Sequence, residues 1–387
     1  MSRLNVSNLF NENEDGAPVV SGISTFSSPN YFVPPSGSTA QRPSSPGEGM
    51  IRFNTDSGHL EYYTGTHWAD VIVNNNELGG GTGSNTGTGV RGLFAGGYSP
   101  SPLGVHNVIQ YITISTLGNA QDFGDLVSTA SAPGGVASRT RGVVAGGGAA
   151  PTNAANNVIS AITISSTGDA TDFGDLVQKT RNQGSVGNQT RGIFAGGINA
   201  SANADINVIQ YITIASSGNS IDFGDISVAK EYLGGGQANS AVRGLFSGGY
   251  VGPATYVDAI EYVTISTTGN SQNFGDLTAG RWIKANLCNS TRAVFAGGYT
   301  DAGSNVIDFV TIASTGNAQD FGDMTSTRAA GNGCSSSTRG VLGGGGFPAV
   351  NTMESIEILS TGNSIDFGDL THVNTYGTAF SNGHGGL

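Results

Sequence analysis

Six arginines recur once in each of six similar stretches of this chain, and six aspartates recur with them. Each arginine opens an apolar phrase such as R-G-L-F-A-G-G, and each aspartate closes a phrase F-G-D. They are Arg91, Arg141, Arg191, Arg243, Arg292 and Arg339, with Asp125, Asp175, Asp225, Asp276, Asp323 and Asp369. A guanidinium and a carboxylate can pair bidentately, so the pattern indicates either a ring of functional charges or structural pairs. Because a ligand site would break such symmetry, we predict structural Arg–Asp pairs.

The other residues that could do chemistry are few and scattered. No pair of histidines has the His-x-His spacing of a copper or zinc site, and neither Gly-x-Ser-x-Gly nor a phosphate-binding loop is present. Glutamates are rare in the repeats, so a glycosidase carboxylate pair has few candidates. Asn273 stands where the other five repeats have an aspartate before F-G-D, which argues against calcium there. We therefore predict no catalytic residue, metal ligand or cofactor, and no enzyme.

The elements that must position these residues are short strands. Each unit has about 50 residues and carries four strand signals: the R-G phrase, a V-I-x-Y-I-T-I phrase, the D-F-G-D phrase and a stretch of small residues. Turn sequences such as S-T-x-G-N separate the second and third of these, and no helical periodicity is present over residues 90–387. The sequence predicts an all-β protein.

The two ends of the repeat region distinguish a closed ring from an open solenoid. The first unit lacks its stretch of small residues, and an extra one, Y-G-T-A-F-S-N-G, follows the last unit at 376–383. A solenoid would need polar caps and would leave two open edges. We therefore predict a six-bladed β-propeller over residues 90–387, with four strands per blade and a C-terminal strand that closes the first blade.

The segments between the double glycine and the V-I phrase differ from unit to unit. Loops on a rigid scaffold commonly carry recognition, and five aromatic residues lie in or beside these segments. They are Tyr98, Tyr250, Tyr256, Tyr299 and Phe347. We predict that they form a ligand-binding surface that stacks on sugars; the alternative is that these rings pack the loops against one another.

Composition limits the choice of partners. The formal net charge is −12, and lysine occurs only as Lys179, Lys230 and Lys284. A nucleic-acid footprint needs a basic patch, so nucleic acid is excluded, and acidity also argues against an anionic membrane surface. No apolar run approaches the length of a membrane span, so we expect no membrane insertion. Cys288 and Cys334 lie in neighbouring repeats, and we expect free thiols.

The N-terminal region differs from the repeats. Residues 1–48 are rich in Ser, Pro, Asn and Gly and are predicted to be an extended arm. Residues 49–73 predict a small three-stranded β-meander that acts as an attachment module, and residues 74–89 predict a Gly/Asn/Thr linker. About 25 residues cannot bury enough surface to fold alone, so this meander needs a partner.

Two resemblances follow from these motifs. The Arg-Gly…Gly-Gly pattern of residues 90–387 resembles the kelch and galactose-oxidase-like propeller repeat, although Phe123 and Phe173 stand where kelch repeats carry Trp. The segment P-S-S-P-G-E-G-M-I-R-F-N-T-D-S-G-H-L-E-Y-Y-T-G-T-H-W resembles a module of tail-fibre and appendage proteins of tailed bacteriophages. The repeat phrase, which reads V-T-I-A-S-T-G-N-A-Q-D-F-G-D at 310–323, also looks like propeller proteins of marine and cyanobacterial phages.

The resemblance implies a non-enzymatic virion structural protein that is assembled in the host cytoplasm. Residues 1–73 would attach it to other virion proteins, in a tail fibre, tail, neck or capsid appendage, or join copies of the chain into a homo-oligomer such as a trimer. The propeller would be displayed for host attachment or decoration, with a surface glycan or protein as receptor. The alternatives are a cellular kelch-type interaction scaffold and, less favoured, a carbohydrate-active propeller enzyme.

Overall fold

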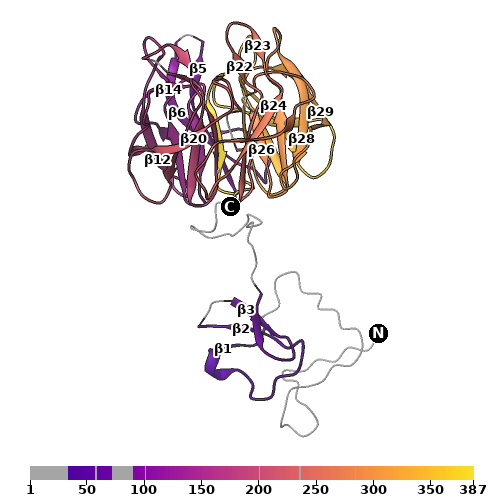
Figure 1. Cartoon of the computed structure of the whole chain (residues 1–387). Coiled ribbons are helices and arrows are strands. Elements are labelled where there is room, and N and C mark those ends of the chain that lie inside the picture. The colour runs from indigo at the N-terminus through magenta and orange to yellow at the C-terminus, as the bar shows by residue number, and fades with distance from the viewer. Residues whose placement is uncertain are drawn as a thin grey trace. The chain divides into compact units, whose positions relative to one another are not determined.

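The computed structural model divides the chain into two compact units, residues 1–75 and 76–387. It describes residues 34–56, 59–71, 90–100, 102–199, 201–234, 237–283 and 285–387. Apart from one short 3-10 turn, η1 (Thr39–Gln41), every described element is a β-strand (Figure 1), which confirms the predicted all-β class. None of the described residues forms a helix long and apolar enough to cross a bilayer.

The first unit contains one small sheet of four strands. Its order is β1 (Ser36–Gly37), β2 (Ile51–Asn54), β3 (His59–Tyr63) and β4 (Trp68–Asp70). The last three are the antiparallel strands that the sequence indicates, whereas β1 pairs parallel with β2 and comes from the predicted extended arm. The pairing is physically reasonable because β2 would otherwise leave an unpaired edge of N–H and C=O groups.

The second unit begins with a sheet that joins both ends of the repeat region. Sheet 1 has the order β34 (Thr378–Ser381), β5 (Arg91–Ser99), β6 (Gly104–Thr113) and β7 (Gln121–Asp125). Strand β34 pairs antiparallel with β5, so the last strand of the chain completes the first sheet. This is the pairing expected from the extra stretch at 376–383.

Five further sheets repeat this order. Sheet 2 contains β8 (Gly134–Ala137), β9 (Arg141–Ala145), β12 (Val158–Thr163) and β13 (Thr171–Asp175). Sheet 3 contains β15 (Gly184–Gly187), β16 (Arg191–Ala195), β19 (Val208–Thr213) and β20 (Ile221–Asp225). Sheet 4 contains β21 (Arg243–Ser247), β24 (Ala259–Thr264) and β25 (Gln272–Asp276). Beside β21, a single bridge from Asn239 to Gly244 stands where the other sheets have an innermost strand.

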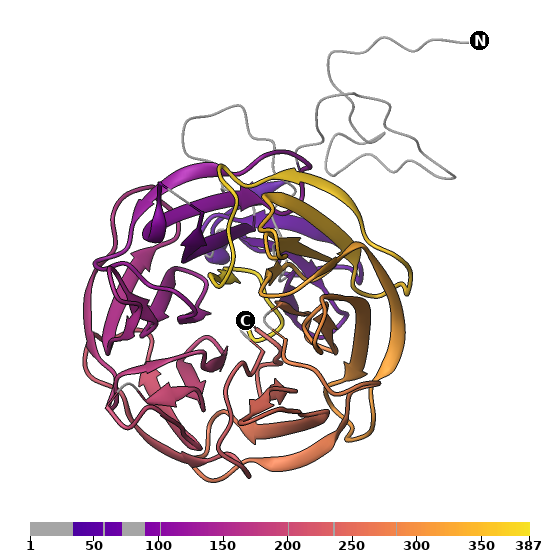
Figure 2. The ribbon, with the colours of Figure 1, turned by 90° about the horizontal axis from the view of Figure 1, so that it is seen from above.

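Sheets 5 and 6 have all four strands. Sheet 5 contains β26 (Ala285–Cys288), β27 (Arg292–Ala296), β28 (Ser304–Thr311) and β29 (Gln319–Arg328). Sheet 6 contains β30 (Asn332–Ser335), β31 (Arg339–Gly343), β32 (Thr352–Glu357) and β33 (Ile365–Asp369). Viewed from above, the sheets follow one another around a common centre, near which the C-terminus lies (Figure 2).

Short additional strands form in the loops after the double glycines and, in one case, in the segment between β13 and β15. They are β10 (Gly148–Ala149) with β11 (Ala154–Ala155), β14 (Thr180–Arg181) with β17 (Ile198–Asn199) and β18 (Ala204–Asp205), and β22 (Tyr250–Val251) with β23 (Thr255–Tyr256). Within this unit, β22 and β23 lie at the end opposite the C-terminus (Figure 1). We call this end the loop end.

The repeated F-G-D and G-N phrases meet where one sheet packs on the next. Gly124 of F-G-D has a φ of +143°, and a Cβ there would lie 2.5 Å from the carbonyl oxygen of Gly168, in the turn of the next sheet. All six F-G-D glycines make this contact, including Gly368 of sheet 6 with Gly118 of sheet 1. Only glycine allows this φ and this close approach, which explains why both glycines recur.

The hydrophobic core lies between successive sheets. One cluster, for example, joins Leu93, Ile109 and Phe123 of sheet 1 to Val144 and Ile162 of sheet 2. The phenylalanine of each F-G-D phrase is at most 3% exposed and belongs to such a cluster. Each sheet therefore buries its faces against its neighbours, and this rigid stack positions the loop end.

Candidate functional site

The six repeated arginines do not pair with the six aspartates, so the predicted Arg–Asp pairs are wrong. Each guanidinium instead donates to a backbone carbonyl that follows the third strand of the next sheet, at 2.8 to 3.3 Å. Arg91, for example, donates to the carbonyl of Ile164, and Arg339 of sheet 6 donates to that of Ile114 in sheet 1. Four of these guanidiniums also lie over an aromatic ring of their own sheet. The arginines therefore have a structural role, but their partners are backbone carbonyls and not the predicted carboxylates.

The aspartates contribute through their backbone. The N–H of Asp125 donates to the side-chain oxygen of Asp169, in the G-D turn of the next sheet, at 3.0 Å, and the other five make the same bond to an asparagine. Within the described part of the chain, no hydrogen bond or ion pair connects the six carboxylates to another residue, and each is exposed or half-exposed. The carboxylates therefore stay hydrated at the outer edge, where a charged partner would contribute little.

Buried ion pairs occur at three other places between sheets. Lys230 Nζ lies 2.9 Å from Glu261 Oε1, and Arg281 Nη2 lies 2.9 Å from Asp308 Oδ2. Arg328 pairs with Glu354 in the same way. All six side chains are at most 6% exposed. Burial raises the pKa of Glu261, but the Lys230 charge and bonds from Ser227 and Ser271 outweigh it, so the pKa is lowered.

The acidic partners share one position, the third residue of the V-I-x phrase. In sheets 4, 5 and 6 it is Glu261, Asp308 or Glu354, and in sheets 1, 2 and 3 it is Gln110, Ser160 or Gln210. At five of the six positions the side chain accepts the backbone N–H of the second residue after an F-G-D aspartate of the preceding sheet. The sequence analysis did not single out this ladder, although a polar residue inside an otherwise apolar strand was a visible signal.

At the loop end, aromatic rings from the loops of sheets 4, 5 and 6 and from the segments that lead into sheets 4, 5 and 1 gather into one cluster. Four of the five predicted aromatic residues belong to it, and Tyr232, Trp282 and Tyr376, which the sequence analysis missed, complete it. The aromatic cluster consists of Tyr232, Tyr250, Tyr256, Trp282, Tyr299, Phe347 and Tyr376, with successive ring centroids 4.7 to 6.4 Å apart. The fifth predicted residue, Tyr98, is 44% exposed and makes no ring contact with this cluster among the described residues.

The aromatic cluster has a buried base and an exposed edge. Trp282 is 6% exposed and stacks on Tyr232 at 4.7 Å, so part of the cluster packs loops together as the alternative interpretation expected. Phe347, in contrast, is 59% exposed. The hydroxyl of Tyr256 lies 3.0 Å from Asp301 Oδ1. At the buried base, burial raises the pKa of the Tyr232 hydroxyl. An exposed aromatic ring can stack on a sugar, and polar groups of the other loops in the cluster can bond the sugar hydroxyls.

Cysteine and metal chemistry are limited in the described residues. Cys288 and Cys334 are free and buried, as expected, and burial raises the pKa of the Cys288 thiol to about 11. In the ranges that the structure describes, no group of three or more His, Cys, Asp and Glu side chains is placed to hold a metal ion.

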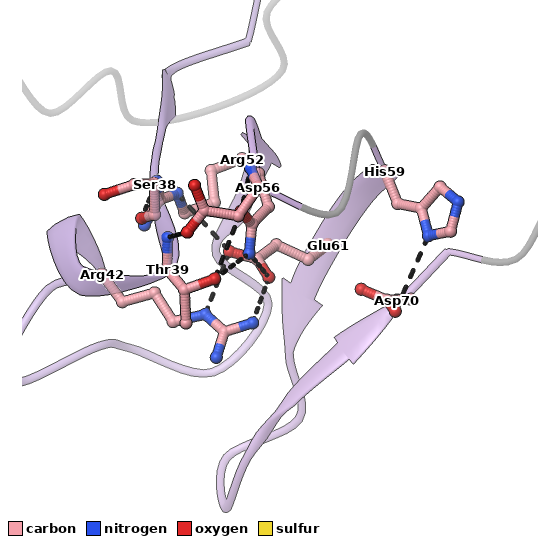
Figure 3. Close-up of polar contacts among 9 residues, drawn as sticks. Ser38, Thr39, Arg42, Arg52, Asp56, His59, Glu61 and Asp70 are labelled. Carbon is pink, nitrogen blue, oxygen red and sulfur yellow. Dashed lines mark hydrogen bonds and ion pairs between the residues drawn. The ribbon is translucent and has the colours of Figure 1, made fainter.

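In the small sheet of the first unit, a charged network occupies the buried face (Figure 3). Glu61 is fully buried, with Arg42 Nη2 at 2.5 Å and Arg52 Nε at 3.6 Å. Asn54 also donates to Glu61, at 3.1 Å. The hydrogen bond from Arg42 outweighs burial and lowers the pKa of Glu61. The segment that carries β1 and η1 supplies Arg42 and thus covers this face.

The opposite face of the small sheet is apolar and exposed. Ile51 and Tyr62 are cross-strand partners, as are Phe53 and Leu60, so the four share one face. Ile51 is 54%, Tyr62 40% and Phe53 37% exposed, and neighbouring Met50 is 46% exposed. We call Ile51, Phe53, Leu60 and Tyr62 the apolar face. The usual arrangement, with polar side chains outside, is therefore inverted.

Comparison with known proteins adds no family. No protein-family model matches the sequence, and no curated protein does. Any functional proposal therefore depends on the chain itself.

Proposed function

We propose that residues 90–387 are a six-bladed β-propeller in which the six sheets are the blades. The proposal is supported by the common strand order and by the C-terminal strand β34 in sheet 1. It is also supported by contacts that connect sheet 6 to sheet 1 as they connect every other pair. The N–H of Gly118 donates to the carbonyl of Phe367 at 2.9 Å, as Gly168 does to Phe123 at 2.7 Å.

We propose that this protein is a non-enzymatic structural component of a tailed-bacteriophage virion. The small sheet attaches it to another virion protein, and the propeller is displayed outward. The observation that carries the proposal is the apolar face, because a sheet that buries its charges and exposes Ile51, Phe53 and Tyr62 is stable in water only when another protein covers it. The resemblance of this segment to phage appendage modules identifies the class of partner.

The displayed end of the propeller is the loop end, and the aromatic cluster is its recognition surface. Six loops converge there on one rigid scaffold, and the exposed ring of Phe347 lies at the edge of the cluster. A host-surface glycan is the receptor class that fits aromatic faces beside hydroxyl and carboxylate groups. The acidic chain, with a net charge of −12, favours a neutral glycan over a polyanionic one.

Attachment is tested on assembled particles. Phage that carry Ile51→Asp and Phe53→Asp in the full-length chain should lose this protein from purified virions, because two charges on the apolar face prevent its burial. Asp70→Asn, a change at an exposed position of β4, is the control and should leave the content of the virions unchanged. Incorporation of the double variant at the wild-type level would contradict the attachment proposal.

Recognition is tested separately with a glycan array and the purified full-length protein. Phe347→Ala should reduce binding to the glycans that wild type retains by about tenfold, which corresponds to the loss of one stacking ring. Tyr98→Ala removes another exposed ring, which lies outside the aromatic cluster, and should have no effect. Absence of any bound glycan, or equal losses in both variants, would remove glycan recognition from the proposal.

A further inference from the structure

Two histidines that lie far apart in the sequence face each other beside the strand that completes sheet 1. His106 belongs to β6, and His372 lies between β33 and β34. Their Nε2 atoms are 3.3 Å apart, although the residues are 266 positions apart in the chain. The side-chain oxygen of Asn374 lies 3.3 Å from the same His106 Nε2. Two potential ligand atoms, His372 Nε2 and Asn374 Oδ1, therefore lie at the same distance from a third, His106 Nε2.

The hydrogen bonds around His372 fix its tautomer. Gln110 Oε1 accepts both the backbone N–H of Thr371, at 2.7 Å, and the Thr371 hydroxyl, at 2.8 Å. Because that hydroxyl has one proton, it can only accept from His372 Nδ1, which lies 3.0 Å away. His372 Nδ1 therefore carries the proton, and its Nε2 presents a lone pair to His106. A second hydrogen bond that holds the far ring nitrogen is typical of metal-binding histidines.

Asn374 is oriented in a similar way. Its side-chain amide donates to the carbonyl of Gly96 at 3.0 Å, which turns Oδ1 toward His106. His106 Nε2 thus faces two acceptors, Asn374 Oδ1 and His372 Nε2. One N–H on His106 could satisfy only one of them, and both separations exceed the ordinary hydrogen-bond length of about 2.9 Å. His106 is 3% exposed, and its Nδ1 has no hydrogen-bond partner among the described residues.

A metal ion accounts for these two equal separations better than a single hydrogen bond from His106 does. Ligands at about 2.05 Å from a tetrahedral zinc ion lie about 3.3 Å from each other. Both separations from His106 Nε2 equal that value. Imidazole nitrogens suit zinc and neighbouring divalent transition metals, and an amide oxygen can complete such a set with water.

We propose that His106, His372 and Asn374 bind one divalent transition-metal ion, of which zinc is the type. The ion joins β6 to the segment that leads into β34, so it fastens the closing strand to the first sheet. Its role is structural, because the ion holds the closing strand in place. The proposal is independent of the function proposed above.

The test is zinc binding by the full-length, metal-free protein, measured by calorimetry and by thermal unfolding. Zinc chloride should bind with one site per chain and raise the unfolding temperature, and EDTA should reverse the rise. His372→Gln should weaken zinc binding at least about tenfold, because it removes a half-buried ligand from a loop. His67→Gln, in the small sheet, is the matched control and should bind as wild type.

Side-chain ¹⁵N NMR provides a readout that does not depend on the stability of a variant. In wild type, zinc should shift the Nε2 resonances of His106 and His372 and leave those of His384 unchanged. His384 is held elsewhere, with Nε2 2.9 Å from the carbonyl of Ala137. Absence of zinc binding to wild type, shifts at other histidines only, or equal affinity in His372→Gln would each overturn the proposal.

Discussion

The contacts between successive sheets of the repeat unit fall into two groups of three. Where sheets 4, 5 and 6 meet the sheet before them, the V-I-x position carries a buried carboxylate with a buried cation, as in Arg281 with Asp308. Where sheets 1, 2 and 3 meet the sheet before them, the V-I-x position carries Gln110, Ser160 or Gln210. Among the described residues, none of these three positions has an ion pair. We call these the charged half and the neutral half.

The comparison of the two halves shows which contacts between sheets occur everywhere and which differ between the halves. Both halves have the same glycine contact between F-G-D and G-N and the same arginine bond to a carbonyl. The polar ladder, in contrast, needs an acceptor for a backbone N–H, and an amide serves as well as a carboxylate. Charge is therefore not needed to stack these sheets. The aromatic cluster lies largely on the charged half.

The largest expected effect comes from breaking one ion pair of the charged half. Arg281→Met should lower the free energy of unfolding by about 3–5 kcal/mol, because it leaves Asp308, which is fully buried, without its cation. Urea unfolding of the full-length variant, followed by the fluorescence of neighbouring Trp282, measures the change. The double variant Arg281→Met with Asp308→Asn removes both charges and should recover most of the loss. Equal instability of the single and double variants would show that charge is not the cause.

The glycine contact should be equally important in both halves. Gly174→Ala, in the neutral half, and Gly224→Ala, in the charged half, place a Cβ 2.6 and 2.5 Å from the nearest backbone atom of the next sheet. Their φ values are +144° and +147°. Each change should cost about 2–3 kcal/mol, measured by thermal unfolding. A difference between the two larger than about 1 kcal/mol would mean that the halves differ in backbone packing as well as in charge.

Removing an uncharged acceptor of the neutral half should lower the free energy of unfolding by a smaller amount. The backbone N–H of Val177 donates to Gln210 Oε1 at 3.0 Å and to Ser220 Oγ at 2.9 Å. Gln210→Ala removes the first acceptor and leaves the second. We expect a loss of about 1 kcal/mol in urea unfolding, because a partner remains. Glu261→Ala at the matched position should cost several times more, since it leaves Lys230 buried without a counter-charge. Similar losses at both positions would remove the distinction between the halves.

The smallest expected effect is a dependence on pH. The folded-state pKa of Glu261 and of Glu354 is lowered below the ordinary value of 4.5, despite burial, by hydrogen bonds and by Lys230 or Arg328. Their contribution to stability is therefore complete above pH 4.5 and is lost as the pH falls through the lowered values. Unfolding temperatures measured from pH 6 downward should fall less steeply for Lys230→Met with Glu261→Gln than for wild type. Parallel curves would contradict this account.

Sequence reasoning went furthest where a feature is local and repeated. The turn and strand phrases predicted the all-β class, the small antiparallel strands at 51–70 and the strand at 376–383 that pairs with β5. Sequence reasoning failed where it had to predict which groups a side chain contacts. The arginines were assigned to the aspartates because opposite charges attract, yet the guanidiniums reach carbonyls of the next sheet. It also missed β1, which is only two residues long and pairs parallel with β2.

The sequence by itself determined where the repeated strands and turns lie, because alternation of apolar residues and the backbone freedom of glycine act within a few residues. It also predicted that Cys288 and Cys334 are free thiols, which the structure confirms. Only the tertiary structure decided which side chains meet: Trp282 with Tyr232 and Tyr376, Arg281 with Asp308, and His106 with His372. These contacts join different sheets, so they depend on how the sheets stack. The spacing of residues along the chain does not predict that stacking.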